Sequence, residues 1–107
     1  MKLSTDRNNF DDLQRSLLRQ FIDSIYRSLL DAGVPRDKLS ELVTEIAFNI
    51  CCAIDGSTVM RRADGRVLPF LTFTKDATLE EIISSGKGSW MHEYVHGAVA
   101  EYLKTKL

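Results

Sequence analysis

Apolar residues recur at helical spacing through the first half of the chain, and this pattern constrains the fold more than any other feature of the sequence. In residues 9–32 they return every three or four positions, as in an amphipathic helix. The stripe consists of Phe10, Leu13, Leu17, Phe21, Ile25 and Leu29, widened by Leu18, Ile22 and Tyr26. Gly33 followed by Val34 and Pro35 marks the end of this first helix.

A second helix is predicted over residues 37–54. Its main stripe is Leu39, Val43, Ile46, Ile50 and Ile54, flanked by Leu42 and Ala53. In residues 46–54 only Asn49 is polar, and Phe48 points about 160–180° away from the stripe at 100° per residue. This half should therefore be buried on all sides, at the centre of the fold or against a partner chain. A buried strand is the alternative for residues 46–54, because short apolar runs fit both structures.

A β-hairpin is predicted next, because two β-prone segments flank an Asp-Gly pair at residues 64–65. Asp-Gly favours a two-residue type I′ turn. The resulting register pairs Ala63 with Arg66, Arg62 with Val67, Arg61 with Leu68, Met60 with Pro69 and Val59 with Phe70. Pro69 then marks an outer edge, since proline cannot donate a hydrogen bond to a neighbouring strand.

Both faces of this hairpin carry apolar side chains. One face holds Thr58, Met60, Val67, Leu71 and Phe73, and the other holds Val59, Leu68 and Phe70. Two strands alone are marginal in water, so helices must cover both faces or a second chain must extend the sheet along its first strand. The pattern therefore predicts a homodimer.

The hairpin tip brings together Arg61, Arg62 and Arg66. Arginines at such a tip can contact phosphate or an acidic partner. They can equally keep an exposed strand edge soluble. The formal net charge of −1 favours the second interpretation. With Phe48, these arginines form the candidate interaction surface.

The last third of the chain is expected to be helical. Thr78 begins a capping box that predicts a short helix ending at Gly86, and Ser89 is the expected N-cap of a final helix over residues 90–104. Lys87 and Gly88 are expected to form a flexible joint. The stretch SSGKGS at residues 84–89 lacks the Walker pattern of a nucleotide site.

The bulk composition limits the possible functions. A chain of 107 residues indicates one domain, and its near-neutral charge disfavours binding to nucleic acid or to an anionic membrane. No run is long enough to span a membrane, and the N-terminus carries no apolar signal core. We therefore expect a cytoplasmic protein in which the adjacent Cys51 and Cys52 are reduced, buried and inert.

One stretch suggests chemistry, the sequence HEYVHG at residues 92–97. On a helix, His92 and His96 lie one turn apart and can bind one ion, and Glu93 can take a proton from metal-bound water. Residues 92–96 resemble the zinc-binding helix of the zincin metallopeptidases. The resemblance implies a zinc-dependent hydrolase with His92 and His96 as metal ligands and Glu93 as general base.

Two observations favour a structural or interface role for these residues instead. Catalytic zinc normally has three protein ligands, and no motif marks the third. The candidates upstream are Glu81, Asp55, Asp64 or a cysteine. In addition, the apolar sector of the last helix points roughly 100–160° away from the motif, so we expect nothing to cover the side that bears it.

The sequence as a whole predicts a single α+β domain over residues 1–107. It comprises two long N-terminal helices, a β-hairpin, a short helix and a C-terminal helix that packs on the hairpin. The favoured function is that of a small cytoplasmic, non-enzymatic protein that acts through self-association, as a homodimer, or by binding another protein. No cofactor is expected. The alternative is a zinc-dependent, metallopeptidase-like hydrolase at His92, Glu93 and His96.

Overall fold

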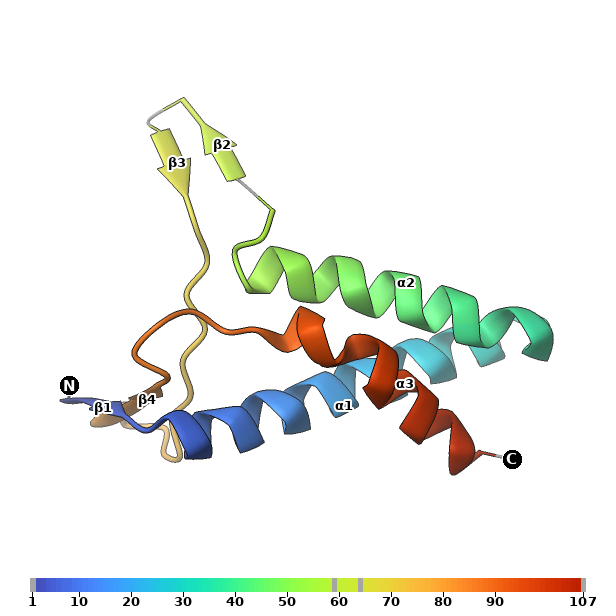
Figure 1. Ribbon diagram of the computed structural model, residues 1–107, viewed down its shortest axis with the longest axis horizontal. Coiled ribbons are helices and arrows are strands. Elements are labelled where there is room, and N and C mark those ends of the chain that lie inside the picture. The colour runs from blue at the N-terminus through green and yellow to red at the C-terminus, as the bar shows by residue number, and fades with distance from the viewer. Residues whose placement is uncertain (1, 59, 64, 107) are drawn as a thin grey trace.

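Two long helices, joined by a short loop, form the frame of the protein. The computed structural model describes residues 2–58, 60–63 and 65–106. In chain order, the elements are β1 (Lys2–Thr5), α1 (Arg7–Asp31), α2 (Arg36–Ile54), β2 (Met60–Arg62), β3 (Gly65–Val67), β4 (Glu81–Ser84), the 3₁₀ turn η1 (Met91–Tyr94) and α3 (Val95–Lys104). Figure 1 shows α1 and α2 running in opposite directions, with α3 packed beside them. The predicted α+β class is confirmed.

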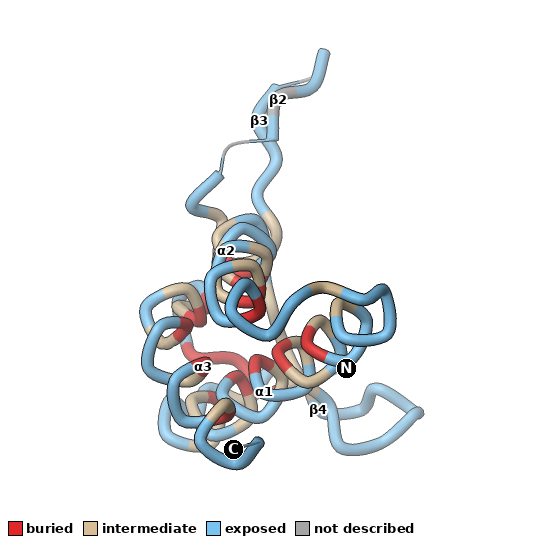
Figure 2. Tube along the Cα trace, turned by 90° about the vertical axis from the view of Figure 1, so that its right-hand side faces the viewer, coloured by how far each residue is buried: buried red, intermediate tan, exposed pale blue. Residues whose placement is uncertain are grey.

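The core lies between the three helices, where Figure 2 shows the buried residues gathered. Each helix contributes a row of buried side chains, and α1 buries Phe10, Gln14, Leu18, Ile22 and Tyr26. The predicted helix is confirmed. Its buried row, however, runs through Leu18, Ile22 and Tyr26, which were predicted only to widen the main apolar stripe. The sequence pattern missed this row because a polar residue, Gln14, stands in the middle of it at 0% exposure.

Helix α2 is helical through Ile54, so the strand alternative for residues 46–54 is wrong. Its buried row is Leu39, Val43, Ala47 and Cys51. Within the chain this half is not buried on all sides, because Ile50 is 39% exposed, and its burial against a partner chain stays a prediction. Among the described helices and strands, only α1 and the η1–α3 segment pack on α2, and two neighbours cannot cover a whole helix surface.

A small parallel sheet pairs the N-terminal strand with a strand from the last third of the chain. β1 pairs with β4 from Lys2 opposite Glu81 to Thr5 opposite Ser84, and Phe73 bridges to Ile83 on the other side. The predicted short helix over residues 78–86 is therefore wrong. The amide and hydroxyl of Thr78 donate to Asp76 in a local turn, which competes with helix initiation. The paired isoleucines of β4 suit a strand.

The hairpin forms, but its register differs from the prediction by two residues. Met60 lies opposite Val67, and Arg62 lies opposite Gly65. The connecting loop is thus residues 63–64, and Gly65 follows it with a φ of 120°, a value that favours glycine. A shift of two residues leaves Met60 and Val67 on one face of the hairpin, as predicted. The predicted partner Val59 and the turn residue Asp64 lie outside the described residues.

The hairpin projects from the helical body, as Figures 1 and 2 show. We call residues 57–70 the arm. Within the described residues, β2 and β3 contact no other helix or strand. The expectation that the C-terminal helix packs on the hairpin is wrong, because the core apolar residues of α3 pack against α1 and α2. The radius of gyration, 15.7 Å, exceeds the value of about 13 Å expected for a compact chain of this length.

None of the helices in the described part of the chain combines the length and the apolar character that crossing a membrane requires.

Candidate functional site

The side chain of Asp55, at the C-terminal end of α2, holds the beginning of the HEYVHG segment in place. This side chain is fully buried. Its Oδ1 accepts a hydrogen bond from the Ser89 hydroxyl at 2.5 Å, and its Oδ2 accepts one from the His92 backbone N–H at 2.7 Å. The predicted N-cap, Ser89, makes no capping bond, so that prediction is wrong. A carboxylate from a different helix takes this role.

The same carboxylate contacts the His92 ring, with Asp55 Oδ2 at 2.6 Å from His92 Nδ1. The imidazole is thereby fixed in orientation, and its Nε2 points away from the carboxylate. Phe48 lies beside both histidines, its ring centroid 6.2 Å from that of His92 and 6.0 Å from that of His96. The expectation that nothing covers this side of the motif is therefore wrong, since α2 lies against it.

The structure brings His92, His96 and Phe48 together but places Glu93 elsewhere. His96 lines a groove between α2 and α3, whereas Glu93 lines a different groove of about 520 Å³ between α1 and α3. The motif begins in the 3₁₀ turn η1, which advances about 120° per residue instead of 100°. The prediction that His92, Glu93 and His96 share one side assumed a regular α-helix, and the winding of η1 departs from it.

A third metal ligand is not brought to the two histidines. Among the described residues, no group of three His, Cys, Asp or Glu side chains is arranged to hold a metal ion. Asp55 approaches only as a hydrogen-bond partner, and Glu81 lies in β4, paired with β1. Asp64 lies outside the described residues.

The two cysteines are free thiols beside this region. Burial, and then the nearby Asp55 charge, raise the pKa of Cys51 to about 12. The same causes raise the pKa of Cys52. Since the thiolate is the nucleophile and the metal ligand, both thiols are poor candidates for either role at neutral pH.

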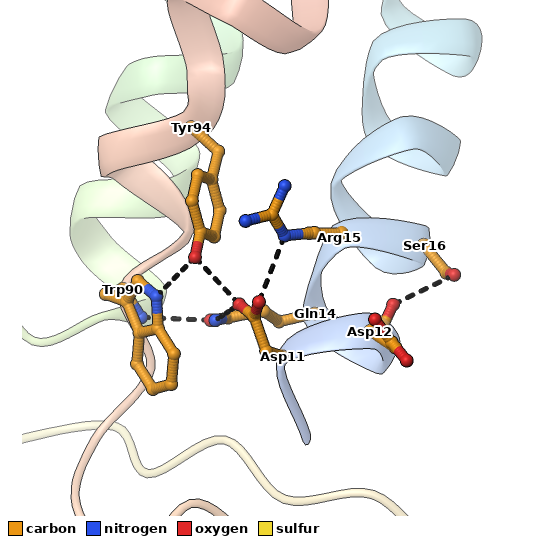
Figure 3. A network of polar contacts seen from close by, with 7 residues as sticks. All are labelled: Asp11, Asp12, Gln14, Arg15, Ser16, Trp90 and Tyr94. Carbon is orange, nitrogen blue, oxygen red and sulfur yellow. Dashed lines mark hydrogen bonds and ion pairs between the residues drawn. The ribbon is translucent and has the colours of Figure 1, made fainter. Parts of the chain in front are cut away.

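A second polar cluster holds the same segment against α1, and Figure 3 shows its contacts. Gln14 accepts a hydrogen bond from the Trp90 backbone N–H at 3.0 Å and donates to Asp11 at 2.8 Å. The Tyr94 hydroxyl donates to Asp11 at 2.8 Å and accepts from the Trp90 indole at 2.8 Å. Arg15 forms an ion pair with Asp11 at 3.1 Å.

This cluster was not predicted from the sequence, and its role is structural. Burial alone would raise the pKa of Asp11, but the three hydrogen bonds it accepts lower that pKa below its usual value. Every buried side-chain polar atom among the described residues has a hydrogen-bond partner. Asp11 from α1 and Asp55 from α2 thus hold residues 89–94 from both sides.

The arm is the second candidate site, and it carries large apolar side chains in water. The most exposed are Met60 at 47%, Val67 at 42%, Leu68 at 54% and Phe70 at 57%. Arg62 and Arg66 are exposed on the same arm, and Arg61 lies opposite Arg66 in the hairpin. Phe48, grouped with these arginines in the predicted interaction surface, lies instead in the groove beside His96.

That groove, which we call the α2–α3 groove, has a volume of about 560 Å³. It is lined by Asp37, Ser40, Glu41, Thr44, Glu45, Phe48 and His96. Its three acidic residues are exposed and make no ion pair with any residue that the structure describes. The groove therefore combines a half-buried aromatic ring with uncompensated negative charge.

The chain matches no protein-family model, and it shows no significant similarity to a curated protein sequence or to a solved structure.

Proposed function

We propose that this protein acts by self-association and that the arm supplies the contact between copies. The observation that carries the proposal is the arm itself, which projects from the body, contacts no other element within the described residues and exposes four large apolar side chains. A cytoplasmic location is part of the proposal, and the two free, high-pKa thiols support it.

The physical argument is that an isolated two-stranded hairpin is marginal in water. Fully burying one large apolar side chain stabilises an interface by about 1.5–3 kcal/mol. The side chains of the arm are roughly half exposed, so each has about half of that energy left to gain. The edge of β2 also leaves backbone groups that a second chain can pair with.

The proposal is tested by measuring the molar mass in solution against concentration, for the wild type and for Phe70→Ser. We expect a reversible dimer for the wild type and a dissociation constant at least about tenfold weaker for the variant, which corresponds to about 1.4 kcal/mol. Leu3→Ser is the matched control, because Leu3 is 62% exposed but lies in β1. A monomeric wild type, or an equal loss in both variants, contradicts the proposal.

A zinc-dependent activity at His92 and His96 is the second candidate. The contact of His92 Nδ1 with Asp55 favours it, because metal-binding histidines usually donate their other ring N–H to a carboxylate or a carbonyl. Two imidazoles would then need a third ligand, and Glu93 would have to turn from the α1–α3 groove to act as general base.

The metal candidate has its own test. Untagged protein is purified and its zinc content measured by mass spectrometry, beside that of His96→Ala. Stoichiometric zinc that is lost in the variant supports the candidate. Zinc far below one equivalent in the wild type removes it.

A further inference from the structure

Two segments of this nearly neutral chain carry opposite net charges. Residues 60–70 of the arm carry three arginines and one aspartate, a net charge of +2, whereas residues 37–48 of α2 carry three acidic residues and one lysine, a net charge of −2. The arm and the α2–α3 groove are therefore complementary in sign. Complementary patches steer association and fix the orientation of two partners.

The acidic residues of the groove are arranged unfavourably for an isolated chain. Asp37, Glu41 and Glu45 follow one another at i, i+4 spacing, and like charges at this spacing destabilise a helix. Phe48 continues the same row and, beside His96, gives the groove an aromatic surface. A segment with arginines next to large apolar side chains complements both the negative charge and the aromatic surface of this groove. Arg66, followed by Leu68 and Phe70, is such a segment.

The arm is badly placed to reach the groove of its own chain. It leaves α2 at the C-terminal end and extends away from the helices, while the acidic row lies in the N-terminal two-thirds of α2. Helix α2 has 19 residues and is about 28 Å long. In a two-fold dimer with the α2 helices antiparallel, the C-terminal end of each lies beside the N-terminal half of the other.

We infer that the arm of one copy docks in the α2–α3 groove of a second copy, with Arg66 beside Glu41 and the apolar side chains of the arm against Phe48. This inference rests on the proposed self-association. A two-fold arrangement makes the contact twice and closes the assembly at a dimer. The α1–α3 groove is a poorer partner, because Arg15 and Arg19 line it together with Glu93 and Glu101.

The test reverses one charge on each side of the contact. Arg66→Glu and Glu41→Arg are purified separately and studied by sedimentation velocity, alone and as an equimolar mixture. Each variant alone should associate at least about tenfold more weakly than the wild type, because like charges then meet at both contacts. The mixture should regain the affinity of the wild type, since the reversed arm meets the reversed groove and the native arm meets the native groove.

Lys75→Glu and Glu101→Arg are the matched controls, because both residues are exposed and lie outside the arm and the α2–α3 groove. They should associate like the wild type. Circular dichroism and thermal unfolding confirm that all variants remain folded, as exposed substitutions should.

The possible failures are distinguishable. If the wild type associates but the two reversals leave its affinity unchanged, or the mixture stays as weak as its components, docking in this groove is overturned while self-association stands. The same holds if only Arg66→Glu weakens association, because the arm then contacts a different surface or ligand. If the wild type is monomeric throughout, self-association fails and this inference fails with it.

Discussion

Replacing Asp55 with alanine should destabilise the protein by about 2–6 kcal/mol, although Asp55 belongs to neither the arm nor the hydrophobic core. The carboxylate accepts hydrogen bonds from the Ser89 hydroxyl and the His92 backbone, and it contacts the His92 ring. Ser89 is only 8% exposed, so its hydroxyl loses its partner inside the protein. A buried donor left without a partner costs about 1–3 kcal/mol, and two donors here lose theirs.

The His92 imidazole adds little to this cost, because its side chain is 28% exposed and water can replace the carboxylate. The assay is urea unfolding followed by circular dichroism at equilibrium. Asp31→Ala is the control, since Asp31 is an exposed carboxylate at the end of α1, and it should lie within about 0.5 kcal/mol of the wild type.

A double-mutant cycle isolates the contact between Asp55 and Ser89. Ser89→Ala should cost about 1 kcal/mol in the wild type and clearly less in the Asp55→Ala background, where its partner is already gone. If Asp55→Ala lies within about 0.5 kcal/mol of the wild type, or if the two substitutions are additive, the reasoning that Asp55 holds residues 89–92 against α2 is refuted.

Three further predictions concern groups inside the helical body. Burial, and then a hydrogen bond to Asp23, raise the pKa of Tyr102 to about 12 from its usual value near 10. The contribution of Tyr102 to stability should therefore be constant below pH 10 and be lost as pH rises from 10 to 12. Alkaline urea titrations check this, and Tyr102→Phe should abolish that loss. Because its pKa is also about 12, Cys51 should not react with a thiol reagent at pH 8 in the native protein and should react once the chain unfolds; rapid native labelling of Cys51 would show that it is not buried as described. Gln14→Leu should destabilise by about 1–3 kcal/mol in urea unfolding, because it leaves the partly buried Trp90 N–H without its acceptor, and an unchanged stability would contradict that.

The helices could be predicted because their signals are local. The apolar spacing of α1 and α2 and the stop signal at residues 33–35 lie within the segments they describe, and both helices are present. The centre of the α1 row could not be predicted, since one of the partners of the buried Gln14 is the Trp90 backbone N–H, 76 residues away. Long-range partners of this kind leave no mark on the local pattern.

The strands also depend on residues far away in the sequence. β4 depends on pairing with β1, which lies 79 residues earlier, and the local capping signal at Thr78 pointed to a helix instead. The hairpin was predicted from its turn residues, but its register depended on where Gly65 places its positive φ. Several of its apolar side chains are exposed in the part of the chain that the structure describes, and their cover by a second chain stays a prediction.

At the candidate sites, the residue types could be predicted but their neighbours could not. The histidine motif is visible in the sequence. The contact of His92 with Asp55 is not, because it arises from the packing of η1 on α2, whose C-terminal end carries Asp55. The charge of the α2–α3 groove was also open to prediction, since its acids recur every four residues. The burial predicted for the second helix concerned residues 46–54, and the three acidic residues precede that segment.

The most direct test of the account is backbone amide hydrogen exchange in the arm, measured at protein concentrations below and above the association midpoint. If the arm forms the contact between copies, the amides of β2 and β3 should exchange freely when dilute and become protected as concentration rises, while those in the centre of α1 stay protected throughout. Arm amides that exchange equally fast at every concentration would contradict the claim that this protein works by associating through its arm.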